Sequence, residues 1–203
     1  MKNTTSPIEE LQGEKITFIE YLVDASEVLI FTENGSIMTV NEDGVVDVKA
    51  QNDDGITGGS ISPDQEYIYV VTNNNTLIQL DMEFDLVKEV PLDDSSTEKS
   101  EGYEPRFSWK ADGSHFAINI QTDKGRKCHT RDSMLGIFRT PSLSDPDPEG
   151  LVQSVSEKSR DNMSKLVSWQ PSGGIIAGSD FINQNGKKIN RVIFWEKNTL
   201  RHL

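Results

Sequence analysis

The chain has 203 residues, of which 34% are apolar and 26% are charged. This length and composition fit one globular domain, or one large fragment of a domain, and exclude a disordered chain. Thirty-three acidic residues against 20 basic ones give a net charge of -13. Because that charge repels phosphate backbones, we expect no direct nucleic-acid binding.

The single cysteine suits a reducing compartment, and the short apolar runs indicate neither a signal peptide nor a membrane span. Cys128 is the single cysteine, so the chain can form no internal disulfide. The amino-terminal sequence MKNTTSPIEEL lacks the apolar run of a signal peptide, and the longest apolar runs are too short to span a membrane. We therefore expect a soluble protein of the cytoplasm, with the nucleus as a second compartment and no membrane association.

Four segments repeat one pattern, in which a short strand, a tight polar turn and an apolar strand follow each other. The segments are Phe18–Thr32, Gly58–Thr72, Pro105–Asn119 and Lys165–Ser179. Their turns, at Asp24, Asp64, Asp112 and Ser172, lie 40, 48 and 60 residues apart. The first two spacings are close to the length of about 40–45 residues of a WD40 repeat, and the third requires a loop insertion.

The turn residues have a physical role in this pattern. Pro63 and Pro171 preset the φ angle of the first turn corner, and Asp112 can bond the local backbone. Gly113 and Gly173 allow a positive φ at the following position. Each turn therefore predicts an antiparallel strand pair.

A further strand is predicted in every repeat, each preceded by turn residues such as Asn-Gly. These strands are Ser36–Val40, Thr76–Asp81, Met134–Arg139 and Arg191–Lys197. A fourth strand is predicted at Leu86–Leu92. The pattern predicts an all-β fold, a partial WD40-type β-propeller of about three to four antiparallel blades that do not close a ring.

The predicted organisation is one partial propeller over residues 1–203. The blade-like repeats lie near residues 16–50, 56–92, 105–157 and 165–203, with polar linkers at 93–104 and 140–164. Because an open propeller leaves strand edges and blade faces uncovered, we expect marginal stability or aggregation of the isolated chain.

No convergent set of reactive groups is visible, so we expect no enzyme, no catalytic residue, no cofactor and no metal. His115 is interpreted as a surface or packing residue. No metal-ligand spacing surrounds Cys128-His129, which is interpreted as part of an exposed loop following Lys124–Lys127. A basic cluster is interpreted as part of a solvated hairpin loop, with contact to tRNA or to an acidic partner as the alternative. It contains Lys124, Arg126, Lys127 and Arg131.

The candidate site residues are structural blade positions. Trp109 and Trp169 occupy equivalent strand positions and predict packing between blades, as does Trp195. The remaining positions are turn residues, namely Asp112, Gly113, Pro171 and Gly173. A propeller hydrolase with carboxylates in its central channel stays a further alternative, although no site marks it.

Several motifs together resemble the amino-terminal WD40-type propeller of the Elongator complex subunit 1 (IKAP) family. SWKADGSHFAI, at Ser108–Ile118, is similar to the family's SWRGDGEYFAV. The other matching segments are Gly58–Leu92 with its EVPL ending, Glu149–Glu157, Val167–Ser179 and Phe194–His202. The chain departs from the family pattern at Thr199 and Leu203, where glycine is usual.

The resemblance implies a truncated, non-catalytic scaffold segment of Elongator. Its expected partners are the second and third Elongator subunits and a second copy of itself. Through these contacts it would support the modification of the tRNA wobble uridine, without touching nucleic acid directly. The alternative is a generic WD40 adaptor with other protein partners.

Overall fold

The computed structural model describes residues 11–92, 104–122, 125–133 and 163–196. Within these ranges the regular elements are β-strands, which form four antiparallel sheets in chain order. The first sheet contains β1 (Ile16–Leu22), β2 (Glu27–Thr32), β3 (Ser36–Val40) and β4 (Val46–Gln51). The second sheet contains β5 (Ile56–Ile61), β6 (Tyr67–Thr72), β7 (Thr76–Asp81) and β8 (Leu86–Pro91).

The third and fourth sheets each have three described strands. The third sheet contains β9 (Arg106–Trp109), β10 (His115–Thr122) and β11 (Gly125–Asp132). The fourth sheet contains β12 (Met163–Trp169), β13 (Ile175–Gln184) and β14 (Lys187–Glu196). In every sheet each strand pairs with the next strand of the chain, so each sheet is a simple meander.

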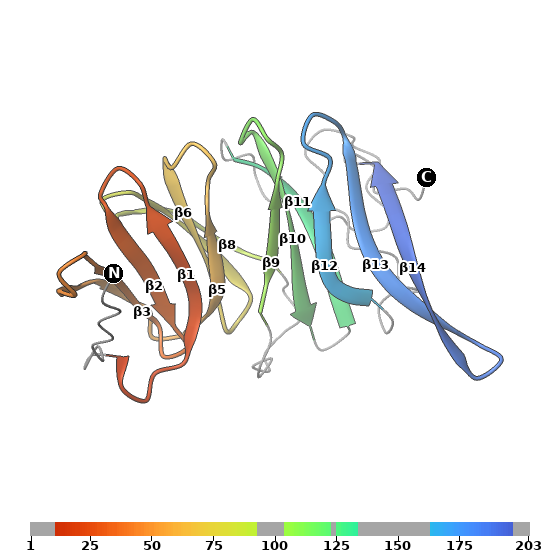
Figure 1. Cartoon of the computed structure of the whole chain (residues 1–203), viewed down its shortest axis with the longest axis horizontal. Helices are drawn as coiled ribbons and strands as arrows, with labels where there is room; N and C mark the ends of the chain where they lie inside the picture. Colours follow the sequence, from red (N-terminus) through yellow and green to blue (C-terminus); the bar gives the residue numbers. More distant parts are fainter. Residues whose placement is uncertain (1–10, 93–103, 123–124, 134–162, 197–203) are drawn as a thin grey trace, which may run out of the picture.

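The four sheets stand side by side in a row, with the first and the fourth at opposite ends (Figure 1). The first strands of successive sheets are neighbours, because β1 contacts β5, β5 contacts β9 and β9 contacts β12. The described residues do not close a ring. The structure therefore confirms the predicted all-β, partial β-propeller with open ends.

Apolar side chains fill the space between successive sheets, because strand residues point alternately to the two faces. We call the face toward the following sheet the front face and the opposite one the back face. In the first sheet Leu29, Phe31 and Ile37 occupy the front face. They pack against the back face of the second sheet, where Ile68 and Val70 are buried.

The same positions pack at the next two interfaces. Tyr69 and Leu77, on the front face of the second sheet, contact Phe116 and Ile118 of the third. On the front face of the third sheet Ala117 meets a cluster from the fourth sheet, which contains Trp169, Ile176, Ile193 and Trp195. One interface is thus built three times from corresponding positions.

Most predicted strands are confirmed, and the third repeat is the exception. Ser36–Val40 and Thr76–Asp81 coincide with β3 and β7. The strand predicted at Met134–Arg139 lies outside the described residues, and the third strand of that sheet is instead β11 (Gly125–Asp132). Its sequence GRKCHTRD has no apolar run, but its backbone pairs with β10 residue by residue. An edge strand tolerates this polarity, so hydropathy alone misses it.

The predicted boundaries need two further corrections. The strand β4 (Val46–Gln51) was not among the predicted strands, because Asp47 and Lys49 interrupt its apolar residues. The linker predicted at residues 140–164 is too long by two residues, because β12 begins at Met163. The remainder of that linker and residues 93–103 lie outside the described ranges. At Asn185-Gly186 the predicted hairpin turn is present, and both residues have the positive φ of a type I′ turn.

Candidate interaction surface

Four β-turns, one between the first and second strand of each sheet, are the feature that the repeats have most clearly in common. Each is closed by a backbone hydrogen bond across four residues, as from Gln65 N to Ser62 O (2.8 Å) and from Gly113 N to Lys110 O (3.0 Å). We call residues 23–26, 62–65, 110–113 and 170–173 the turn row.

Hydrogen bonds connect neighbouring turns of this row. Val23 N in the first turn donates to Gln65 Oε1 in the second (3.3 Å). Ala111 N in the third turn donates to Pro171 O in the fourth (3.0 Å). These bonds join the first turn to the second and the third turn to the fourth. Gly113 of the third turn lies beside Asp64 and Pro63 of the second, so the four turns form one continuous surface. Exposed carboxylates, including Asp24, Asp64 and Asp112, lie on this surface.

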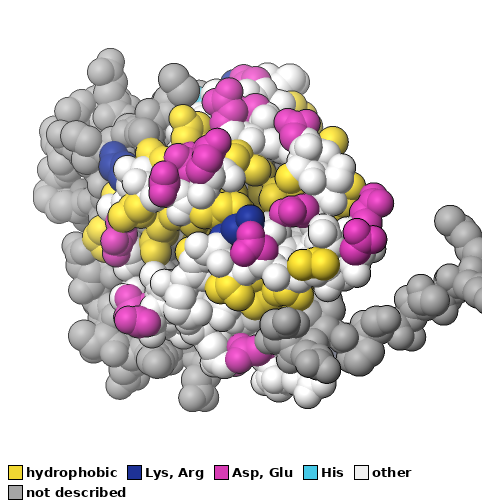
Figure 2. All heavy atoms as spheres, turned by 90° about the vertical axis from the view of Figure 1, so that its left-hand side faces the viewer, with side chains coloured by type: hydrophobic (Ala, Val, Ile, Leu, Met, Phe, Trp, Pro, Cys, Tyr) yellow, Lys and Arg dark blue, Asp and Glu magenta, His cyan; other side chains and the backbone are white. Residues whose placement is uncertain are grey.

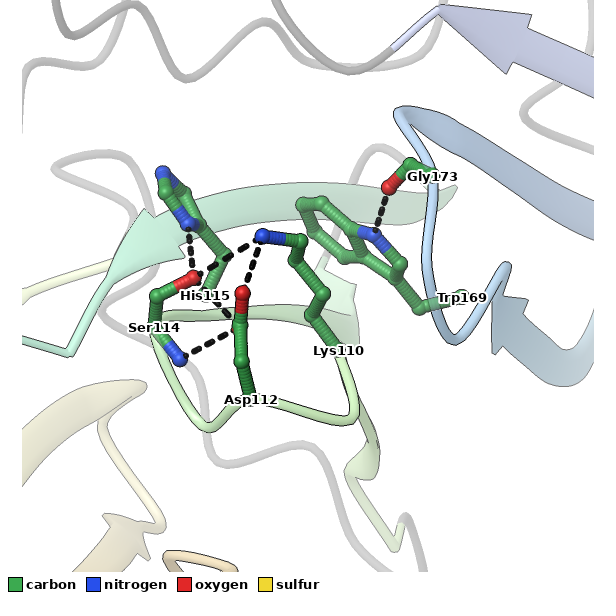
Figure 3. Close-up of polar contacts among 6 residues, drawn as sticks. All are labelled: Lys110, Asp112, Ser114, His115, Trp169 and Gly173. Carbon is green, nitrogen blue, oxygen red and sulfur yellow. Dashed lines mark hydrogen bonds and ion pairs between the residues drawn. The ribbon is translucent and has the colours of Figure 1, made fainter.

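The third turn carries a polar network around Asp112 (Figure 3). One carboxylate oxygen of Asp112 accepts hydrogen bonds from Ser114 N (3.0 Å) and Ser114 Oγ (2.6 Å). The other forms an ion pair with the ammonium group of Lys110, which also donates to Ser114 Oγ (3.3 Å). The ring atom Nδ1 of His115 lies 2.8 Å from the same hydroxyl.

The Ser114 hydroxyl donates to the Asp112 carboxylate, which can only accept. The role of His115 Nδ1 toward the same hydroxyl depends on the tautomer of its ring. Asp112 is a weak base, because hydrogen bonds from Lys110 and then from Ser114 hold the pKa of its carboxyl far below its ordinary value.

The lowered pKa predicts a pH dependence that the variant Asp112→Asn removes. A carboxyl whose pKa is lower in the folded state stabilises the fold above the unfolded value of about 4, and the contribution is lost as the pH falls below it. We expect wild type to exceed Asp112→Asn in urea midpoint at pH 7, with a smaller difference at a pH of about 2.5. Asp64→Asn is the matched control, because Asp64 accepts from Glu66 N (3.2 Å) at the same turn position. An equal difference at both pH values would contradict the interpretation.

The tryptophans lie at the sheet interfaces in three different ways. Trp109 contacts Tyr69 and Phe116 and donates from Nε1 to Ser60 Oγ of the second sheet (2.8 Å). Trp169 is 3% exposed, and its indole donates to Gly173 O within its own turn (2.9 Å). Its backbone N–H donates to Ser108 Oγ of the third sheet (2.7 Å).

Trp195 completes this set at the interface of the third and fourth sheets. It is 1% exposed and packs on the backbone of Gly178, where a Cβ would lie 2.5 Å from its ring. Sequence reasoning found the three tryptophans but missed their partners Ser60 and Ser108. No local pattern marks a serine whose partner lies 49 or 61 residues away, so only the packing identifies them.

The turn glycines differ from each other. Gly113 has a φ of 69°, as predicted, whereas Gly173 does not adopt a positive φ, so that expectation is wrong. A Cβ at Gly173 would lie 1.9 Å from Gln170 Oε1, so this glycine provides space and not a left-handed backbone. Ser26 and Gln65 hold the positive φ in the first two turns. Pro171 is exposed and is the second residue of the fourth turn.

The loop placement of Cys128-His129 is wrong. Both residues lie inside β11, where their backbones pair with Asn119 and Ile118 of β10. Arg126, Lys127 and Arg131 of the basic cluster belong to the same strand, while Lys124 lies outside the described residues. Among the described residues no group of three or more His, Cys, Asp or Glu side chains could hold a metal ion.

A shallow groove of about 430 Å³ follows the first strands of the first three sheets. Ile16, Ile19 and Gly58 line it, together with the exposed ion pair between Arg106 and Glu104 (2.8 Å). Besides this pair, the lining combines apolar side chains with the hydroxyl groups of Thr17 and Ser60. In the described part of the chain no helix is long and apolar enough to cross a membrane.

Comparison with known proteins gives matches along the whole chain. The family model of the ELP1 first N-terminal beta-propeller matches residues 1–104 and 93–203. Elongator complex protein 1 of Oryctolagus cuniculus is 26% identical over 92% of this chain and 15% of its own length. The Schizosaccharomyces pombe protein of that name is 22% identical over 93% of this chain and 17% of its own length. The chain thus spans about a sixth of these relatives.

Proposed function

Because the chain belongs to the family of the ELP1 first N-terminal beta-propeller, we propose that it is a non-catalytic scaffold segment of the Elongator complex. It acts through protein–protein contacts with the second and third Elongator subunits, and so supports modification of the tRNA wobble uridine. The observation that carries this proposal is the family match, which extends over both halves of the chain.

The structure supports a binding role in three respects. The turn row is a continuous surface anchored by sheet-to-sheet hydrogen bonds, so a partner would meet a preorganised set of side chains. Its exposed carboxylates suit a partner with basic side chains and disfavour phosphate. The network around Asp112 stabilises the third turn of the row. We further propose the cytoplasm as its compartment, with the nucleus as a second one, and propose no cofactor.

Affinity purification tests the proposal directly. The full chain, tagged and expressed in cells of its source, is expected to recover the second and third Elongator subunits, identified by mass spectrometry. The double variant Asp24→Lys, Asp64→Lys reverses exposed charges of the turn row and is expected to lower the recovery severalfold if that surface makes the contact. Asp43→Lys, in the exposed loop between β3 and β4, is the matched charge control.

Two results would contradict the proposal. Recovery of no Elongator subunit by a folded wild-type chain would remove the assignment to the complex. Recovery of an unrelated set of proteins would favour the generic adaptor. In both cases circular dichroism of the purified chain must show β-structure, so that loss of the fold is not mistaken for loss of the partner.

A further inference from the structure

Two hairpin turns of the chain contain the dipeptide Asn-Gly. Asn34-Gly35 connects β2 to β3, and Asn185-Gly186 connects β13 to β14. In this dipeptide the backbone nitrogen of glycine can attack the side-chain amide of asparagine, because glycine has no side chain to hinder the approach. The local sequence therefore makes the two asparagines about equally reactive, and any difference between them comes from the fold.

The turn at Asn34 holds both of the groups that would react. The side-chain nitrogen Nδ2 of Asn34 donates to the two carboxylate oxygens of Glu14 (2.8 and 2.9 Å). The backbone nitrogen of Gly35 donates to Thr32 O (3.0 Å), and its carbonyl accepts from Asn52 N (2.9 Å). A Cβ at Gly35 would lie 1.9 Å from Asn52 O, so this turn cannot rotate without displacing its neighbours.

The turn at Asn185 lies at the tip of a two-stranded ribbon, which reaches beyond the neighbouring sheets (Figure 1). Within the described residues, β13 pairs beyond Asp180 with β14 alone, and residues 183–192 are all exposed. In the same part of the chain Gly186 N donates no hydrogen bond, and a Cβ at Gly186 would meet nothing within 4 Å. Because the end of such a ribbon opens locally at little cost, Gly186 N can reach the side chain of Asn185.

The charges around the two turns also differ. The attacking nitrogen must lose its proton, so cationic neighbours lower the barrier and carboxylates raise it. Two exposed lysines, Lys187 and Lys188, directly follow the second turn. The first turn follows Glu33 and is bonded to Glu14, and Figure 2 shows carboxylates spread over the first-sheet side of the molecule. Hydrogen bonding and charge therefore favour reaction at the same site.

We propose that Asn185 is a site of spontaneous deamidation in the folded chain, and that the fold protects Asn34 from the same reaction. Gly186 N bonds to Asn185 Cγ, the Cγ–Nδ2 bond breaks, and Nδ2 leaves as ammonia with the proton that Gly186 N has lost. Water then opens the resulting succinimide at either carbonyl and gives aspartate or isoaspartate. Both products add a negative charge beside Lys187, and isoaspartate also lengthens the main chain by one carbon, which the two-residue turn cannot accommodate. This inference is independent of the proposed function.

Peptide mapping by mass spectrometry tests the proposal on the purified full chain, incubated in a mildly alkaline buffer. Digestion with trypsin gives one peptide of residues 16–49, which contains Asn34, and one of residues 166–187, which contains Asn185. We expect Asn185 to deamidate at least about tenfold faster than Asn34. Hydrogen bonds to a charged group, such as those from Asn34 to Glu14, are strong enough to slow the reaction by that factor.

The same incubation in guanidinium chloride separates the effect of the fold from that of the sequence, since both asparagines should react at similar rates in the unfolded chain. Gly186→Ala places a methyl group beside the attacking nitrogen and is expected to preserve Asn185. Gly44→Ala is the matched control, because Gly44 is also a left-handed glycine with nothing within 4 Å of its Cβ position, and it should leave the loss at Asn185 unchanged. Equal rates at the two sites of the folded chain, faster loss at Asn34, or no loss at Asn185 would overturn the proposal.

Discussion

Trp195→Ala is expected to lower the free energy of unfolding by about 3–5 kcal/mol, the usual cost of removing a buried tryptophan side chain. Trp195 is 1% exposed and lies at the centre of the cluster between the third and fourth sheets, with Trp169, Ile176 and Ile193 around it. The backbone of Gly178 lies against the indole, so that a Cβ at position 178 would stand 2.5 Å from the ring. The variant leaves a cavity at the interface of two sheets.

Urea unfolding followed by far-ultraviolet circular dichroism measures this effect without depending on tryptophan fluorescence. Single domains have a free energy of unfolding of only about 5–15 kcal/mol. The variant should therefore lose most of its stability, and with it most of the cooperative unfolding transition. Trp195→Phe is the control. Because it retains an aromatic ring, its loss of stability should be less than half of the loss in Trp195→Ala. Equal midpoints for wild type and Trp195→Ala would show that this interface does not hold the sheets together.

Gly59→Ala is expected to lower the stability by about 1–3 kcal/mol, as overpacking of a core does. Gly59 lies in β5, where a Cβ would stand 2.4 Å from a ring carbon of Phe31 and 2.4 Å from the backbone oxygen of Tyr69. The Phe31 ring cannot retreat freely, because it stacks on Phe18 with centroids 4.8 Å apart. The methyl group therefore forces the first and second sheets apart.

Gly44→Ala is the matched control for this variant. Gly44 has a φ of 79°, but a Cβ there would meet nothing within 4 Å. Its substitution should cost only the strain of a left-handed alanine, about 1 kcal/mol. In Gly59→Ala the loss of stability should come with a change at the interface of the first and second sheets. Hydrogen exchange of the β2 and β6 amides can detect this change. A cost for Gly59→Ala no greater than for Gly44→Ala would show that the contact of Gly59 with Phe31 is not tight.

The sequence predicts most strands of the fold because each repeat contains its own local signals. In the segment from Gly58 to Thr72 the turn residues Pro63 and Asp64 separate two apolar stretches, and the structure has β5 and β6 there. β4 and β11 escaped prediction because their residues are polar or interrupted, and backbone pairing with a neighbour holds them in place. The resemblance to the Elongator subunit 1 family is confirmed, since it rests on motifs that local sequence carries.

The surface could not be predicted to the same degree, because it depends on contacts between repeats. Gly113 and Gly173 look alike in the sequence, but only Gly113 has a positive φ. The reason is the packing around each turn, where Gly173 lies against Gln170 and its carbonyl accepts the indole N–H of Trp169. The same holds for Asp112, whose pKa follows from the position of the Lys110 ammonium group.

The sequence by itself determined the strand pattern, the turn positions and the family, because these depend on residues close together in the chain. Only the tertiary structure decided which face of each sheet is covered. Val28 and Ile68 occupy the same position of the repeat, but Ile68 is buried in the core between the first two sheets, whereas Val28 is only partly buried beside Ile30 and Met38. Alternation assigns a side chain to a face, and the segments packed on that face determine how far it is buried.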